Sequence, residues 1–158
     1  MAVNVANIEW AQSQKNGSVT FTPCKAGGAV IQLRLQDTAI VWEPSVYGGD
    51  GSENRVNISF KCPPDVAAHV HAMEASLGDV CSCLRDDVLK CKVSLDKVAI
   101  YDESKQRIAK PISIKGYSCN AIVNIRGKWA TRTQQGLCLE CTNLQLLSQG
   151  EPTQACPF

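Results

Sequence analysis

The segment from Ser104 to Leu139 contains no aspartate or glutamate, although the whole chain of 158 residues has a net charge of only +1. Seven basic residues fall within it: Lys105, Arg107, Lys110, Lys115, Arg126, Lys128 and Arg132. Two aromatic residues, Tyr117 and Trp129, lie among them. Basic side chains can follow a phosphate backbone, and aromatic rings give bases a surface on which to stack. This combination favours a surface that binds single-stranded nucleic acid, with an ordinary solvated face as the alternative.

Cysteines are the second group of residues that could do chemistry. There are nine of them: Cys24, Cys62, Cys81, Cys83, Cys91, Cys119, Cys138, Cys141 and Cys156. An odd number, behind an N-terminus without the features of a secretory signal, favours reduced thiols in an intracellular compartment.

The cysteine spacing leaves a metal site open as an alternative. The set nearest to zinc-site spacing is Cys81, Cys83, Cys91, Cys138 and Cys141. Cys138 and Cys141 belong to a stretch that is typical of a strand, however, and cysteine packs well as a small buried hydrophobe. We therefore interpret the thiols as buried and structural, and we expect no metal and no cofactor.

The sequence contains no set of residues typical of an enzyme active site. The patterns GxxxxGK[ST], GxSxG and HExxH are absent, as is GxGxxG after a strand. His69 and His71 are two residues apart on a predicted helix, about 200° around its axis, so they cannot share a metal ion. The chain is therefore predicted to bind rather than to catalyse.

The elements that must position these residues are mostly strands. Period-two alternation of apolar residues predicts strands at 29–35, 38–42, 55–60, 93–100, 107–115, 117–126 and 137–147. Helical spacing predicts one principal helix at 65–77, with Asp65 as its N-cap. A second short helix within 79–91 is an open alternative. Gly127 predicts a bulge or bend just before Trp129.

This pattern predicts a mainly β fold, a small antiparallel β-barrel with one principal α-helix. The predicted divisions are an N-terminal arm at 1–28, the barrel domain at 29–147 and a polar C-terminal tail at 148–158. No apolar stretch approaches the roughly 18 to 20 residues that span a membrane, so no membrane partner is expected.

The run from Cys119 to Trp129, followed by the run from Gln135 to Leu147, has a recognisable order of parts. An alternating strand leads to Gly127 and an aromatic residue, and after a polar loop Gly136 opens a closing strand. This order resembles the last two strands of OB-fold single-stranded DNA-binding proteins of large DNA viruses and phages. The resemblance implies an OB-like barrel over 29–147. It also implies non-catalytic, largely sequence-independent binding of single-stranded DNA in replication or recombination, with RNA as an open alternative.

The resemblance also implies roles for particular residues. The nucleic-acid-binding set would be Lys105, Arg107, Lys115, Tyr117, Arg126, Lys128, Trp129, Arg132 and Trp42. Phe158, at the end of a tail that carries only Glu151 as an acid, would dock on replication enzymes.

A homo-oligomer in the host nucleus or cytoplasm is expected for such a protein. From another class of proteins, a self-assembling structural subunit of a virion shell or filament remains the alternative.

Overall fold

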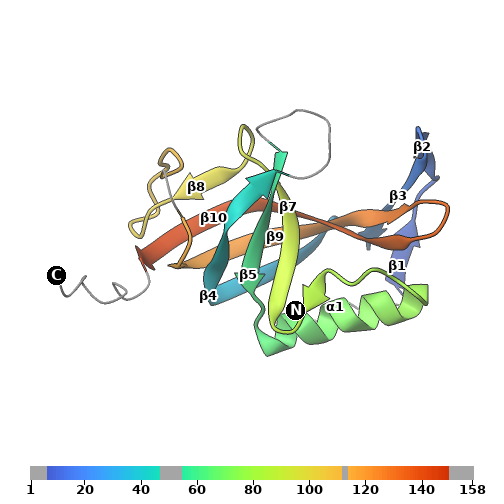
Figure 1. Ribbon diagram of the computed structural model, residues 1–158, viewed down its shortest axis with the longest axis horizontal. Coiled ribbons are helices and arrows are strands. Elements are labelled where there is room, and N and C mark those ends of the chain that lie inside the picture. The colour runs from blue at the N-terminus through green and yellow to red at the C-terminus, as the bar shows by residue number, and fades with distance from the viewer. Residues whose placement is uncertain (1–6, 47–54, 112–113, 150–158) are drawn as a thin grey trace.

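The structure is a computed structural model that describes residues 7–46, 55–111 and 114–149. Within these residues it contains ten strands and one helix (Figure 1). They are β1 (Ile8–Trp10), β2 (Gln14–Asn16), β3 (Val19–Ala26), β4 (Ile31–Val46), β5 (Arg55–Lys61), α1 (Pro64–Leu77), β6 (Leu84–Arg85), β7 (Val88–Ser94), β8 (Ala99–Tyr101), β9 (Tyr117–Ala130) and β10 (Gln135–Gln149). The predicted class, mainly β with one principal helix, is confirmed. None of the helices in the described part is long and apolar enough to cross a membrane.

Five of the strands pair in a closed ring. β9 pairs with β4, β4 with β5, β5 with β7, β7 with β10, and β10 again with β9. The pairings of β10 with β7 and with β8 are parallel, so the prediction of a purely antiparallel sheet is wrong at these two places. Parallel neighbours need a long crossover connection, and β9 with its flanking loops supplies one between β7 and β10.

The inside of the ring is the hydrophobic core, and the predicted alternation is confirmed there. On β9 the inward residues Cys119, Ala121, Val123 and Ile125 are at most 4% exposed. The other strands bury the faces expected of them: Ile31, Leu33 and Leu35 on β4, and Val56, Ile58 and Phe60 on β5. Burial of these side chains is the main force that holds the ring together.

Helix α1 follows β5 and lies beneath the strands in the view of Figure 1. Its predicted range is confirmed to within one residue. Val66, Val70 and Met73 form its buried face, as their helical spacing predicts. The N-cap is Pro63 rather than Asp65, because the helix starts one residue earlier, with Pro64 at the first position, where a missing N–H costs nothing.

The region after the helix differs from the prediction. Residues 79–91 contain no second helix; instead β6 and β7 form a hairpin whose turn places Asp86 at a φ of 56°. The buried carboxylate of Glu74 supports this segment, because it accepts hydrogen bonds from the Ser82 hydroxyl (2.7 Å) and the Cys83 N–H (3.0 Å). Sequence periodicity could not show this support, which comes from the preceding helix.

Two further strand predictions need correction. Strands were expected at 29–35 and 38–42 with a turn between them, but β4 runs through both. The turn is a bulge where Asp37 has a φ of 50° and donates its N–H to Asn120 Oδ1 at 2.9 Å. No strand forms in the described part of 107–115, where an isolated bridge joins Arg107 to Tyr101.

The segment predicted as an N-terminal arm forms strands β1, β2 and β3 in its described part. β3 pairs with β9 beside the ring, from Thr20 opposite Ala130 to Pro23 opposite Gly127, and β1 and β2 flank β3. These strands extend the sheet and contribute few side chains to the core, so their sequence is mostly polar and lacks the apolar alternation that predicts strands. The predicted loop at 47–52 and the tail from residue 150 onward lie outside the described residues.

Candidate nucleic-acid interface

Strands β9 and β10 form the frame of the candidate interface. Their register shifts once near Gly127, where Arg126 is the extra residue of a β-bulge, as predicted. Glycine is required at 127 because a Cβ there would overlap the carbonyl oxygen of Thr22 on β3. The close approach of β3 brings its residues next to Arg126.

A hollow of about 610 Å³ lies where β3, β7, β9 and β10 meet. We call it the basic pocket; its lining residues are Phe21, Pro23, Cys24, Lys25, Val30, Lys92, Val93, Ser94, Lys97, Arg126, Cys138 and Glu140. Four of these residues are cations and one is a carboxylate. Such an excess of positive charge in a concave surface attracts phosphate groups.

The carboxylate in the basic pocket is paired. Glu140 Oε1 accepts a hydrogen bond from Arg126 Nη2 at 3.2 Å, and both side chains are about a third exposed, at 35% and 38%. Burial raises the pKa of the nearby Cys138 thiol above its ordinary 9.0, although the positive charges of Lys92 and Arg126 oppose the shift. Cys138 is therefore a neutral wall of the pocket, and the charge comes from the basic side chains.

The structure separates the predicted site residues into several places. Arg126 lies in the basic pocket. Trp129 is half-buried next to it: the residue opposite on β3 is Phe21, which lines the pocket, and a Cβ on Gly136 would come within 2.9 Å of the indole. Gly136 therefore makes room for the ring.

Lys128 has an aromatic partner that the sequence did not suggest. Its ammonium lies 5.1 Å from the ring centre of Trp10 on β1, within the range of a cation–π interaction. Trp10 is 38% exposed and is one of the large hydrophobic side chains at the surface. This contact joins β1 to β9, on the face of β9 opposite to that of the neighbouring residue Trp129.

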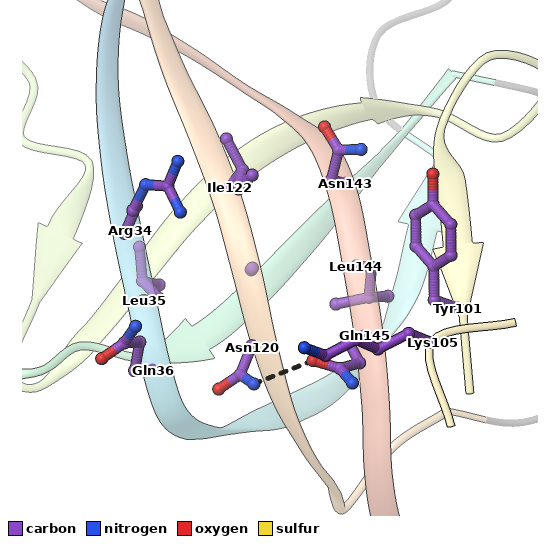
Figure 2. Close-up of a pocket in the computed structure, with 11 residues that line it drawn as sticks. Arg34, Leu35, Gln36, Tyr101, Lys105, Asn120, Ile122, Asn143, Leu144 and Gln145 are labelled. Carbon is purple, nitrogen blue, oxygen red and sulfur yellow. Dashed lines mark hydrogen bonds between the residues drawn. The ribbon is translucent and has the colours of Figure 1, made fainter. Parts of the chain in front are cut away.

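Lys105 lies in a different hollow, of about 540 Å³, on β4, β9, β10 and the loop after β8 (Figure 2). We call it the amide pocket because four amide side chains line it: Gln36, Asn120, Asn143 and Gln145. Its other lining residues are Arg34, Leu35, Tyr101, Lys105, Ala121, Ile122 and Leu144. The structure therefore does not bring the predicted basic residues together in one trough: Arg126 lines the basic pocket and Lys105 the amide pocket.

The remaining predicted residues line neither pocket. Arg107, Lys115 and Arg132 are exposed, and Tyr117 is half-buried against the core. The backbone of Trp42 pairs with β5, but its side chain lies outside what the structure describes, as does all of Phe158.

Sequence reasoning missed Lys25, Lys92 and Lys97 of the basic pocket. They lie far from the 104–139 segment in the sequence, and only the pairings of β3 with β9 and of β7 with β10 bring them to Arg126. The available signal was the outward position of Lys92 in its strand, between the inward residues Cys91 and Val93.

Most of the described thiols belong to the interior. All eight cysteines in the described ranges are free. Cys24, Cys62, Cys91, Cys119 and Cys141 are buried, Cys83 and Cys138 are half-buried, and Cys81 is exposed. In the same ranges no group of three or more His, Cys, Asp or Glu side chains could hold a metal ion.

Comparison with solved structures relates this arrangement to known proteins. A C-terminally truncated single-stranded DNA-binding protein from bacteriophage Enc34 superposes with a TM-score of 0.58 at 10% identity, over 91% of this chain and 97% of that one. The same phage protein in complex with ssDNA gives 0.56 at 12% identity, over 92% and 98%. The chain shares the fold of these proteins.

A third structure, of the single-stranded DNA-binding protein from bacteriophage Enc34, gives a TM-score of 0.53 at 10% identity over 95% of this chain and 96% of that one. No protein-family model matches the sequence, and no curated protein does. The resemblance seen in the last two strands is therefore confirmed at the level of the fold and over most of the chain. These likenesses do not support the alternative of a virion-shell or filament subunit.

Proposed function

We propose that this protein is a non-catalytic, largely sequence-independent single-stranded DNA-binding protein, and that its five-strand ring is an OB-like barrel. The ring closes through β9, β4, β5, β7 and β10, and its inside is a continuous core. The structural neighbours bear the name of single-stranded DNA-binding proteins, and one of them is in complex with ssDNA.

The basic pocket is the observation that carries this proposal. Lys25, Lys92, Lys97 and Arg126 come from four parts of the chain and line one hollow. Ammonium and guanidinium groups bind phosphates without reading bases, and release of counterions from the DNA makes such binding strongly dependent on salt. Phe21 lines the same hollow and Trp129 lies opposite it on β9, and their rings offer base-stacking surfaces that tolerate any sequence.

The predicted site residues outside the pocket remain part of the proposal. Arg107, Lys115 and Arg132 are exposed cations that would extend the phosphate path at its ends. In the proposed role, replication enzymes dock on Phe158 and copies of the protein associate with one another along the DNA strand. The proposed location is a reducing intracellular compartment.

Charge-removal variants test the proposal. Lys25→Ala with Lys97→Ala removes two exposed cations from the basic pocket. The matched control is Lys61→Ala with Arg85→Ala, which removes two exposed cations opposite Val88, at the other end of β5 and β7. Binding of labelled oligo(dT) is followed by fluorescence anisotropy over a series of salt concentrations, with a duplex of the same length as a second ligand.

The pocket variant is expected to bind oligo(dT) about tenfold more weakly and to lower the slope of log K against log salt by roughly 1 to 2. The control variant should keep the wild-type slope, and the wild type should prefer the single strand to the duplex. An unchanged slope in the pocket variant would show that the DNA binds elsewhere.

A further inference from the structure

The amide pocket lies at the opposite end of the same sheet surface as the basic pocket. Asn120, Ile122, Asn124 and Arg126 alternate with core residues along β9 and so form one row on the outside of the ring, although Asn124 is itself buried, at 7% exposure. Asn120 and Ile122 line the amide pocket, and Arg126 lines the basic pocket. At about 3.3 Å per residue, roughly 20 Å of strand separates Asn120 from Arg126.

The chemistry of the amide pocket suits a nucleotide. Arg34, from β4, and Lys105, from the loop after β8, are both exposed and are its two cations. Among its described lining residues none is acidic. Tyr101 stands at the edge of the pocket with its ring beside β10 (Figure 2). Cations bind a phosphate, and an aromatic ring gives a base a surface on which to stack, so the pocket contains the groups that a nucleotide needs.

Hydrogen bonds hold the loop that carries Lys105 in place. Its N–H donates to the carbonyl of Asp102 at 2.9 Å, and its φ is 66°, a conformation that residues other than glycine rarely adopt. Gln145 Nε2 donates to the carbonyls of Asp102 and Glu103, both at 3.4 Å, and so ties the loop to β10. Backbone strain of this kind is often held at functional sites.

The floor of the pocket is equally ordered. Asn120 Nδ2 donates to Gln145 Oε1 at 3.0 Å (Figure 2). The side-chain oxygen Oδ1 of Asn120 accepts the N–H of Asp37 at the bulge of β4. In Figure 2 the side chain of Lys105 extends from the loop toward these two amides. These hydrogen bonds connect β4, β9, β10 and the loop after β8. The segments that carry Arg34 and Lys105 are therefore held in fixed positions relative to each other.

We propose that the amide pocket is a second subsite for the same DNA strand, which binds one nucleotide through its phosphate and stacks its base on Tyr101. This inference rests on the proposed single-stranded DNA binding. The strand would run along the outward row of β9 between the two pockets. A strand too short to cover the separation would reach only the basic pocket.

Dependence on oligonucleotide length tests the second subsite. Oligo(dT) from about 4 to about 16 nucleotides covers the range of site sizes for one such domain. Arg34→Ala with Lys105→Ala should bind the shortest strands as the wild type does and the longest about tenfold more weakly, with a salt slope lower by roughly 1 to 2 on long strands alone. Lys25→Ala with Lys97→Ala should weaken binding at every length.

Tyr101 variants add a readout that does not depend on charge. Tyr101→Leu should weaken binding of long strands severalfold without changing the salt slope, and Tyr101→Phe, which keeps the ring, should behave as the wild type. Thermal melting of each variant checks that the fold is intact.

The outcomes separate this inference from the proposed function. If Arg34→Ala with Lys105→Ala binds every length as the wild type does, while the basic-pocket variant loses affinity, the second subsite is wrong and the proposed function stands. If the Arg34→Ala with Lys105→Ala variant instead binds oligo(dT) of every length more weakly by the same factor, the subsite is also wrong, because such a result would reflect the overall positive charge of the protein surface and not a local contact. If neither variant loses affinity, both proposals fail.

Discussion

Strand β9 has two faces with different chemistry. Its inward side chains are a thiol and aliphatic groups, and Cys119, Val123 and Ile125 are fully buried. Its outward row carries two amides, one isoleucine and the guanidinium of Arg126. In the proposed function, one face of the strand serves stability and the other binds DNA, so each property can be changed while the other is kept.

Alkaline pH acts on the buried thiols, of which Cys119 lies on the inward face of β9, and gives the largest expected effect. Burial raises the pKa of Cys119 and Cys141 to about 12, and that of Cys24 and Cys62 to about 11, from an ordinary 9.0. Because the folded-state pKa is higher, the folded chain holds its protons more tightly than the unfolded chain. This contribution to stability is complete below pH 9 and is lost as pH rises toward 11 and 12.

The free energy of unfolding should therefore be level from pH 7 to 8 and fall above pH 9, by up to about 1.4 kcal/mol per pH unit for each thiol. Urea unfolding under a reductant measures this at a series of pH values. A urea midpoint that stays constant up to pH 10 would contradict the burial of these thiols.

Ile125→Ala tests whether stability depends on the inward face of β9 separately from DNA binding. Removing a fully buried isoleucine leaves a cavity in the ring and should lower the free energy of unfolding by roughly 2 to 5 kcal/mol. The folded fraction should still bind oligo(dT) with the wild-type salt slope. A changed slope at a temperature where the variant is folded would show that the two faces are not independent.

Gly127→Ala tests the close approach of β3 to β9, which affects both stability and the basic pocket. The added Cβ would meet the Thr22 carbonyl, so β3 must shift, at an expected cost of about 1 to 3 kcal/mol. Since β3 carries Phe21 and Lys25 into the basic pocket, affinity for oligo(dT) should fall as well. Chemical denaturation and anisotropy measure the two effects, and Gly17→Ala, at a turn glycine with open space around it, controls for loss of a glycine. Wild-type affinity in Gly127→Ala would remove β3 from the interface.

Glu140→Gln gives the smallest expected change and acts on the outward face alone. Its ion pair with Arg126 is partly exposed, so stability should change by less than about 1 kcal/mol. Affinity for oligo(dT) should rise severalfold, because the pocket loses its carboxylate and Arg126 is released for a phosphate. A fall in affinity, measured by anisotropy at low salt, would contradict the placement of DNA in the basic pocket.

The sequence predicted what depends on local pattern. Alternation identified the inward faces of β4, β5 and β9, helical spacing identified α1, and Gly127 indicated the bulge, because each pattern reflects burial or backbone geometry at that point. The basic segment indicated Arg126 as part of a binding surface, and the structure places this residue in the basic pocket.

What the sequence did not predict depends on partners distant in the chain. The hairpin of β6 and β7 is supported by Glu74 on the helix, and Lys25 and Lys97 reach the pocket only through strand pairing. Trp10 lies in a segment without a clear strand pattern and contacts Lys128, which is more than a hundred residues away. Local periodicity carries no information about such contacts.

The most direct test of the account is the map of backbone amides that respond to a short oligo(dT) in a ¹⁵N–¹H correlation spectrum. The largest shift changes are expected at Lys25, Lys92, Lys97 and Arg126, with small changes at the hairpin turn near Asp86 and on the exposed side of α1. The largest changes at that turn or on α1, with the basic pocket unaffected, would contradict the account.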